Sequence, residues 1–170
     1  MAGKKFSEFT TGVAVTSNTR IAGYVNGGTT NNIWTPAELA TGLQEHLTES
    51  FIVACSDETT DLAVADGVAT FQLPYDFTLL AGKEGIRASV NTAPVGSAIT
   101  VDIEMGGSTI LSGLLTIDVN EKTSYTSSSI VAISTTALTQ NTEIKVNIDQ
   151  IGSGTAGKGL KVMFIGYKTI

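Results

Sequence analysis

From residue 51 onward, apolar and polar residues alternate along the chain, and this period of two limits the fold more than any other feature. Successive side chains of a strand point to opposite faces, so the alternation indicates strands with one buried and one exposed face. The positions expected to point inward are Ala69, Phe71 and Leu73, then Ile99, Val101, Ile103 and Met105, then Ile144, Val146 and Ile148, and finally Leu160, Val162 and Phe164.

Shorter apolar runs and turn-type sequences complete this pattern. The runs "GIRASVN", "GLLTIDV" and "SIVAIS" are further candidate strands, and "NTAPVGS", "EMGGST" and "DVNEKTS" separate the strands. About eight strands at this spacing predict an all-β fold, an antiparallel β-sandwich of the jelly-roll kind, over residues 50–170.

Residues 1–49 follow a different pattern and predict a small N-terminal module of an extended arm, a β-hairpin and a short helix. Two β-capable runs flank Asn26-Gly27-Gly28, and Asn-Gly accepts the positive φ angles of a tight hairpin turn. The segment "TPAELATGLQEHL" predicts the helix. Thr35 is suited to the N-cap, Pro36 to the first helical position, and Glu38 completes a capping box with Thr35.

The predicted helix carries one narrow apolar stripe, Leu39, Leu43 and Leu47. A module this small buries little apolar surface by itself, so we expect it to pack on a neighbouring protein. The last strand is apolar on both faces, so we expect another subunit to cover its second face. The candidate interface residues are therefore Phe6, Phe9, Ile21, Tyr24, Ile33, Trp34, Leu39, Leu43, Leu47, Met163 and Ile165.

Residues 152–158 read "GSGTAGK", which matches the first seven positions of a phosphate-binding loop. Gly159 occupies the position of the Ser or Thr that would bind Mg²⁺ in such a loop. The following residues alternate with period two and predict a strand, whereas a phosphate loop leads into a helix N-terminus. We therefore expect a hairpin tip that joins the last two long strands, and no nucleotide site.

Two groups of carboxylates are the remaining candidates for chemistry. Asp102 and Glu104 share one strand face about 6.6 Å apart, near the separation found in inverting glycosidases. Outward-pointing polar residues are equally typical of any half-exposed strand, which is the interpretation we favour. The densest acidic group lies in a predicted loop, where we favour a solvated turn over a Ca²⁺ site, because the EF-hand spacing is absent. It comprises Asp57, Glu58, Asp61 and Asp66.

The chain has one cysteine, Cys55, and one histidine, His46. Cys55 lies in the apolar run "FIVACS" and is expected to be a small buried residue. With one histidine and one cysteine, the sequence offers no recognisable Ser-His-Asp, Cys-His or clustered-histidine arrangement. The sequence therefore predicts a protein without enzymatic activity, cofactor or metal.

The charge and hydropathy of the chain argue against nucleic acid and membranes as partners. The net charge of -6 argues against nucleic acid, because such binding depends on Lys and Arg that release counterions from phosphates. No apolar run approaches the roughly 20 residues that cross a bilayer, and the first residues do not resemble a secretory signal. We expect synthesis in a cytosol and no membrane partner.

The segments "LPYDFTL", "IRASVNTAPVGS", "VDIEMGGSTIL", "LTIDVNEKTS" and "VNIDQIGSGTAGKGLKV" occur in order between Ser56 and Gly166. Together they resemble a β-sandwich module of structural proteins of tailed bacteriophages, found in head fibres, decoration proteins and tail-fibre or baseplate components. The chain departs from that pattern at "LLAGKEGIRA", which lengthens one loop. The front part, "TRIAGYVNGGTTNNIWTPAELATGL", resembles the start of phage fibre and spike chains.

The resemblance implies a virion protein made in the host bacterial cytoplasm. In such chains the front segment attaches to the virion or begins a trimeric stalk, so a homotrimer is expected, docked to the major capsid protein or to tail or portal-proximal proteins. The short chain favours a head fibre or decoration protein over a tail fibre, tail adaptor or baseplate subunit. A glycan-binding adsorption module is a further alternative, with Tyr75, Tyr125 and Tyr167 as the aromatic residues of the sandwich.

Overall fold

The computed structural model describes residues 21–24, 31–44 and 47–169, and the remaining residues are outside this description. Contacts divide the chain into two compact units, residues 1–46 and 47–170. The first strand of the second unit, β3 (Glu49–Ala54), begins at the residue where the sequence predicted the N-terminal module to end.

In the first unit, the antiparallel strands β1 (Ile21–Tyr24) and β2 (Asn31–Trp34) precede helix α1 (Pro36–Gln44). The predicted capping box is present. The Glu38 amide donates to Thr35 Oγ1 at 3.2 Å, and the Thr35 amide donates to Glu38 Oε2 at 2.6 Å. The helix ends before Leu47, earlier than predicted, since its last turn contains Gly42, a poor helix former, and no basic residue.

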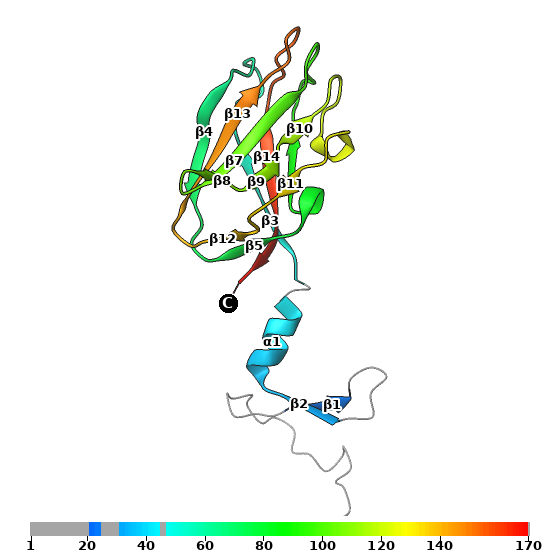
Figure 1. Cartoon of the computed structure of the whole chain (residues 1–170), viewed down its shortest axis with the longest axis vertical. Helices are drawn as coiled ribbons and strands as arrows, with labels where there is room; N and C mark the ends of the chain where they lie inside the picture. Colours follow the sequence, from blue (N-terminus) through cyan, green and yellow to red (C-terminus); the bar gives the residue numbers. More distant parts are fainter. Residues whose placement is uncertain (1–20, 25–30, 45–46, 170) are drawn as a thin grey trace, which may run out of the picture. The chain divides into compact units, whose positions relative to one another are not determined.

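Two five-stranded antiparallel sheets form the second unit, and we name them by their central strands (Figure 1). The β13 sheet has the order β10-β7-β13-β4, with β8 paired to β7. The β14 sheet has the order β12-β5-β14-β3, with β6 paired to β14. The bounds in the β13 sheet are β4 (Ala65–Gln72), β7 (Ile99–Met105), β8 (Ser108–Thr109), β10 (Leu115–Ile117) and β13 (Glu143–Gln150).

Beside β3, the β14 sheet contains β5 (Phe77–Leu79), β6 (Ile86–Ser89), β12 (Ala137–Leu138) and β14 (Lys161–Lys168). A small separate pair is formed by β9 (Leu111–Gly113) and β11 (Ala132–Ile133). The 3-10 turns η2 (Gly82–Glu84) and η3 (Ser124–Thr126) lie in the connections.

The strand pairs are nested. β3 pairs with β14, β4 with β13, β5 with β12, and β7 with β10, and successive pairs alternate between the two sheets. A long hairpin wound in this way around a common core is a jelly roll. The predicted all-β jelly-roll sandwich is thus confirmed.

Nesting also corrects one prediction. Residues 151–160 do not form a hairpin tip, because β13 and β14 belong to different sheets and the segment crosses from one to the other. The period-two pattern correctly identified both strands. That pattern does not tell which strands pair with each other. In the structure, β13 lies between β4 and β7, whereas β14 pairs with β3, β5 and β6.

The core lies between the sheets and contains the alternating residues predicted to point inward, among them the fully buried Ile103, Val146 and Phe164. A cluster of aromatic rings adds to the aliphatic side chains. The Phe51 ring stacks on Phe164 at 4.9 Å between centroids. Cys55 is buried as predicted, and burial raises the pKa of its thiol to about 11, which leaves it protonated and unreactive at neutral pH.

The nested pairing also fixes which loops meet. Glu49 lies opposite Gly166, so the sandwich begins and ends at one end, whereas Ala54, Lys161 and Ser89 lie side by side at the other. The segments that leave this second end are residues 55–64, 90–98, 118–123 and 151–160. We call them the distal loops.

Candidate functional site

The "GSGTAGK" segment is held by the other distal loops. The backbone of Lys158 pairs with that of Thr92, and its Nζ donates to the Thr59 carbonyl at 2.9 Å. Lys158 Nζ also lies 3.4 Å from Asp61 Oδ1. The predicted strand after the segment is confirmed as β14. The lysine that a phosphate loop would turn toward its ligand is therefore engaged within the protein.

The acidic distal loop is likewise paired with groups of the chain itself. Asp57 Oδ1 accepts from the Thr59 amide, the Thr59 hydroxyl and the Thr60 amide at 2.7, 2.8 and 2.7 Å. The hydrogen bonds from Thr60 and Thr59 hold the pKa of Asp57 well below its usual range. Glu58 forms an ion pair with Lys161. In the part of the chain that the structure describes, no three His, Cys, Asp or Glu side chains converge to hold a metal ion.

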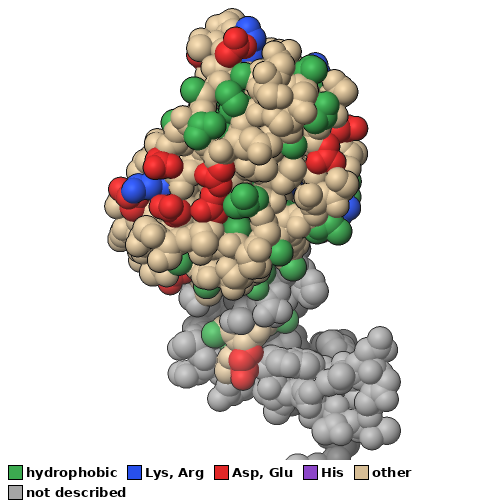
Figure 2. Space-filling model, turned by 45° about the horizontal axis from the view of Figure 1, so that its top comes forward, with side chains coloured by type: hydrophobic (Ala, Val, Ile, Leu, Met, Phe, Trp, Pro, Cys, Tyr) green, Lys and Arg blue, Asp and Glu red, His purple; other side chains and the backbone are tan. Residues whose placement is uncertain are grey.

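A second acidic group lies on the outer face of the β13 sheet, where Figure 2 shows acidic side chains gathered. Asp102 and Glu104 of β7 lie opposite Asn147 and Lys145 of β13. The pKa of Asp149 is raised by its partial burial and then by the neighbouring charges of Asp102, Asp66 and Glu104. The predicted sharing of a face by Asp102 and Glu104 is confirmed, and the group is a region of mutual repulsion.

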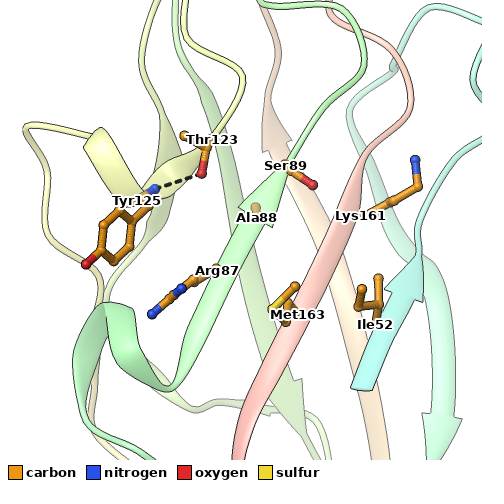
Figure 3. A pocket seen from close by; sticks show the side chains of 8 residues that line it. All are labelled: Ile52, Arg87, Ala88, Ser89, Thr123, Tyr125, Lys161 and Met163. Atoms are coloured by element: carbon orange, nitrogen blue, oxygen red, sulfur yellow. Dashed lines mark hydrogen bonds between the residues drawn. The ribbon is translucent and has the colours of Figure 1, made fainter. Parts of the chain in front are cut away.

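The outer face of the β14 sheet carries a shallow pocket of about 370 Å³ (Figure 3). Tyr125 and Arg87 form one side, Ile52 and Lys161 the other, with Met163 between them. The full lining is Ile52, Arg87, Ala88, Ser89, Thr123, Tyr125, Lys161 and Met163. β3, β6 and β14 bring Ile52, Arg87 and Met163 together, because Met163 lies opposite both Ile52 and Arg87 in the sheet register, and the η3 segment beside β6 adds Thr123 and Tyr125.

The charged groups of the pocket already have partners. Arg87 contacts Glu84 at 2.5 Å, and its guanidinium lies 4.5 Å from the centre of the Tyr125 ring. Lys83 Nζ lies 4.6 Å from the same centre. The surface that lines the pocket is mainly apolar, and Ile52 is its most prominent apolar residue, 58% exposed.

The structure places the predicted interface residues as follows. Met163 and Ile165 are half-buried on the outer face of β14, and Met163 lines the pocket. Leu39, Leu43 and Leu47 are 41%, 54% and 68% exposed. The remaining residues are not described at the level of side chains: Phe6 and Phe9 lie outside the described residues, and Ile21, Tyr24, Ile33 and Trp34 are described only as backbone of β1 and β2.

The sequence pattern did not single out Ile52, and it offered Tyr125 only as a sugar-stacking candidate, not as a neighbour of Ile52. Ile52 could have been found, because "FIVA" places it between the inward-facing Phe51 and Val53, as another strand that is apolar on both faces. Tyr125 lies in a hydroxyl-rich connection whose path depends on long-range contacts, so no local pattern places it beside Ile52.

Comparison with known proteins found no matching family model, curated protein or solved structure. Among the described residues, no helix is long and apolar enough to cross a membrane.

Proposed function

We propose that this protein is a structural component of a tailed-bacteriophage virion, a head fibre or decoration protein that docks by its N-terminal module. The observation that carries the proposal is the jelly-roll sandwich, an architecture used by viral capsid proteins, combined with the phage-like segments in its sequence. Fold alone does not define function, so the sequence resemblance supplies the phage assignment and the fold agrees with it.

The exposed leucines of α1 support docking by the N-terminal module. The helix has nine residues, and isolated helices shorter than about 12–15 residues are marginally stable in water. Leu39 and Leu43 nevertheless remain largely exposed. Contact with another protein would bury this stripe and stabilise the helix. The proposed partners are the major capsid protein or proteins near the tail and portal, with three copies of the chain per assembly.

The ion pairs between side chains of the sandwich support a structural role in the virion rather than catalysis. Lys158 is engaged with Asp61, Arg87 with Glu84, and Lys161 with Glu58. Such mutual pairing holds surface loops and strands in place. The proposed role needs no cofactor, and it places the protein in the virion after synthesis in the host cytoplasm.

Immunogold electron microscopy of purified particles tests the proposal. Antibodies raised against the recombinant protein should label the head in a regular array. Label confined to the tail or baseplate would replace the head assignment by the tail-fibre or tail-adaptor alternative. Particles without label, but with label in the lysate, would overturn the virion assignment.

Glycan adsorption is less well supported as an alternative. Sugar recognition by stacking needs a free aromatic face, and cations lie over two of the three tyrosine rings of the sandwich, Tyr125 and Tyr75. Binding of the recombinant protein to a glycan array would restore this alternative.

A further inference from the structure

The edges of the two sheets are protected to different degrees. A free edge presents unpaired N–H and C=O groups, and proteins block it with charges, bulges, short strands or covering segments. The β4 edge carries Asp66 and a bulge around Gly67, which has a φ of 63° and shifts the register with β13. At the other side, β12 is two residues long, and β10 lies against β6 and η3.

The β3 edge has none of these protections within the described residues. Its six residues read "ESFIVA", with no charge after Glu49, no Pro and no Gly. Its register with β14 is continuous from Glu49 to Ala54, so no bulge turns the edge away. Ile52, the most exposed apolar side chain of the β14 sheet's outer face, lies in the middle of this strand.

Hydrogen-bond alternation shows which groups of β3 point away from the sheet. The Cys55 amide donates to the Leu160 carbonyl at 2.8 Å, so residues of the same parity, Phe51 and Val53, direct their backbone groups to β14. The N–H and C=O groups of Ser50, Ile52 and Ala54 therefore point to the open edge. These residues also carry the outward-facing side chains.

The hydrophobic core is also incompletely covered next to the β3 edge. Phe51 and Val53 point inward but are only half-buried. The Phe51 ring contacts Phe71 of β4 at 5.9 Å between centroids, across the gap between the two edge strands of the sandwich. A further strand beside β3 would satisfy the backbone groups and would bury apolar side chains on both faces of the sheet.

We propose that β3 pairs antiparallel with β3 of a second copy of this chain, about a two-fold axis at Ile52. Ile52 then lies opposite Ile52 of the partner subunit, with Ser50 opposite Ala54 of the partner subunit. These are the residues whose backbone groups point outward, so this register makes hydrogen-bonded pairs. On the inner face, Phe51 lies opposite Val53 of the partner subunit, a favourable aromatic–β-branched pair.

Self-complementarity is the reason for choosing a second copy as the occupant. A two-fold axis brings identical patches together, so any like charges near the axis would repel. β3 has its one charge, Glu49, at the end of the strand, where the two-fold axis keeps the two Glu49 side chains far apart. The apolar surface of Ile52 and Met163 would also continue from one copy to the other.

The pairing does not depend on the proposed virion role. Pairing through β3 doubles the number of chains in any assembly that the N-terminal module forms. A chain that is otherwise monomeric therefore becomes a dimer, and a trimer becomes a six-chain assembly. The number of copies is therefore even in either case.

Native mass spectrometry and sedimentation of the full chain at micromolar concentration test the pairing. The unaltered protein should contain two or six chains, and Ile52→Lys should halve that mass, because lysine at the dyad places like charges opposite each other. Thr70→Lys, at the exposed edge of β4, is the matched control and should leave the mass unchanged. Ile52→Pro removes only an outward-pointing amide donor and should also halve the mass.

Hydrogen exchange supplies a second readout that separates loss of pairing from loss of folding. In Ile52→Lys the amides of Ser50 and Ala54 should exchange at least about tenfold faster, while those of Phe51 and Val53, bonded to β14, keep their protection. A mass of one or three chains for the unaltered protein would overturn the pairing, and three chains would leave the proposed trimer standing. An unchanged mass in both Ile52 variants would also overturn it.

Discussion

Phe164 shows how much one side chain contributes to this sandwich. It is fully buried, stacks on Phe51 and meets the edge of Phe71 at 5.6 Å. Its neighbour Ile165 points to the outer face and is only half-buried. Alternate residues of one strand thus differ sharply in the apolar contact they make, which gives a direct test of the core.

We expect Phe164→Ala to lower the free energy of unfolding by about 3–5 kcal/mol, because it removes a buried ring and leaves a cavity. Urea titration followed by circular dichroism measures the change. Ile165→Ala, one residue along, should cost clearly less. Equal losses for the two variants would contradict the assignment of the inner and outer faces.

Asp149 gives a prediction about pH. Partial burial and neighbouring carboxylates raise the pKa of Asp149 in the folded protein, so the folded state binds this proton more tightly than the unfolded chain does. The associated stability is present at low pH and is lost as pH rises through the folded pKa. Asp149→Asn should therefore be more stable than the unaltered protein at pH 7, by up to about 0.5 kcal/mol for this surface position.

Urea titrations of both proteins at neutral and acidic pH measure this difference. The advantage of Asp149→Asn should shrink with added salt, which screens the repulsion from Asp102 and Glu104, and should vanish below about pH 4, near the ordinary pKa of Asp. A gain in stability that persists in acid would show that packing, and not charge, distinguishes the variant.

At the level of elements, β14 organises its sheet because it pairs with β3 on one side and with both β5 and β6 on the other. Gly166 allows this close approach. A Cβ atom at that position would lie 2.1 Å from the Thr78 carbonyl oxygen and 2.7 Å from Phe77 Cε1. The contact involves backbone, so the neighbouring strand itself has to move to accept a larger residue.

Gly166→Ala is therefore expected to destabilise the sandwich by about 1–3 kcal/mol, the usual cost of overpacking. Denaturant titration measures the loss. Gly107→Ala in the turn between β7 and β8 is an informative comparison, since its Cβ would meet nothing within 4 Å and only its φ of 81° opposes the change. A smaller loss for Gly166→Ala than for Gly107→Ala would contradict the packing of β14 on β5.

For the whole molecule, the nested topology means that most strand pairs join distant parts of the chain. β3 pairs with β14, and Phe51 lies opposite Phe164. The entropy cost of closing long loops has to be met before these distant strands make stabilising contacts. All-β sandwiches of this kind therefore fold on the order of milliseconds to seconds. Even so, the two ends of the sandwich finish side by side, which leaves the distal loops together at the other end.

Stopped-flow refolding, followed by circular dichroism, should show a main phase in this range whose rate is independent of protein concentration. A main phase in the microsecond range would contradict a topology in which the first strand of the sandwich, β3, pairs with the last, β14. Phe51→Ala and Phe164→Ala should both speed unfolding, because each weakens this closing pair of strands.

The sequence by itself determined the features that depend on neighbours in the chain. Alternation identified the strands around Ile103, Val146 and Phe164 together with their inner faces, and the Thr35–Glu38 capping box located the start of α1. It also showed that a strand follows "GSGTAGK". These signals are local, because a period of two and a cap are properties of a few consecutive residues.

Only the tertiary structure decided which strands pair and what they leave uncovered. Any two alternating strands are equally able to form a hairpin on local grounds, so the sequence joined β13 to β14 where the fold separates them into different sheets. The pocket between Ile52 and Tyr125 and the open edge of β3 depend on the same long-range choice. Pairing is selected by how well all the strands bury one common core, and that is a property of the whole chain.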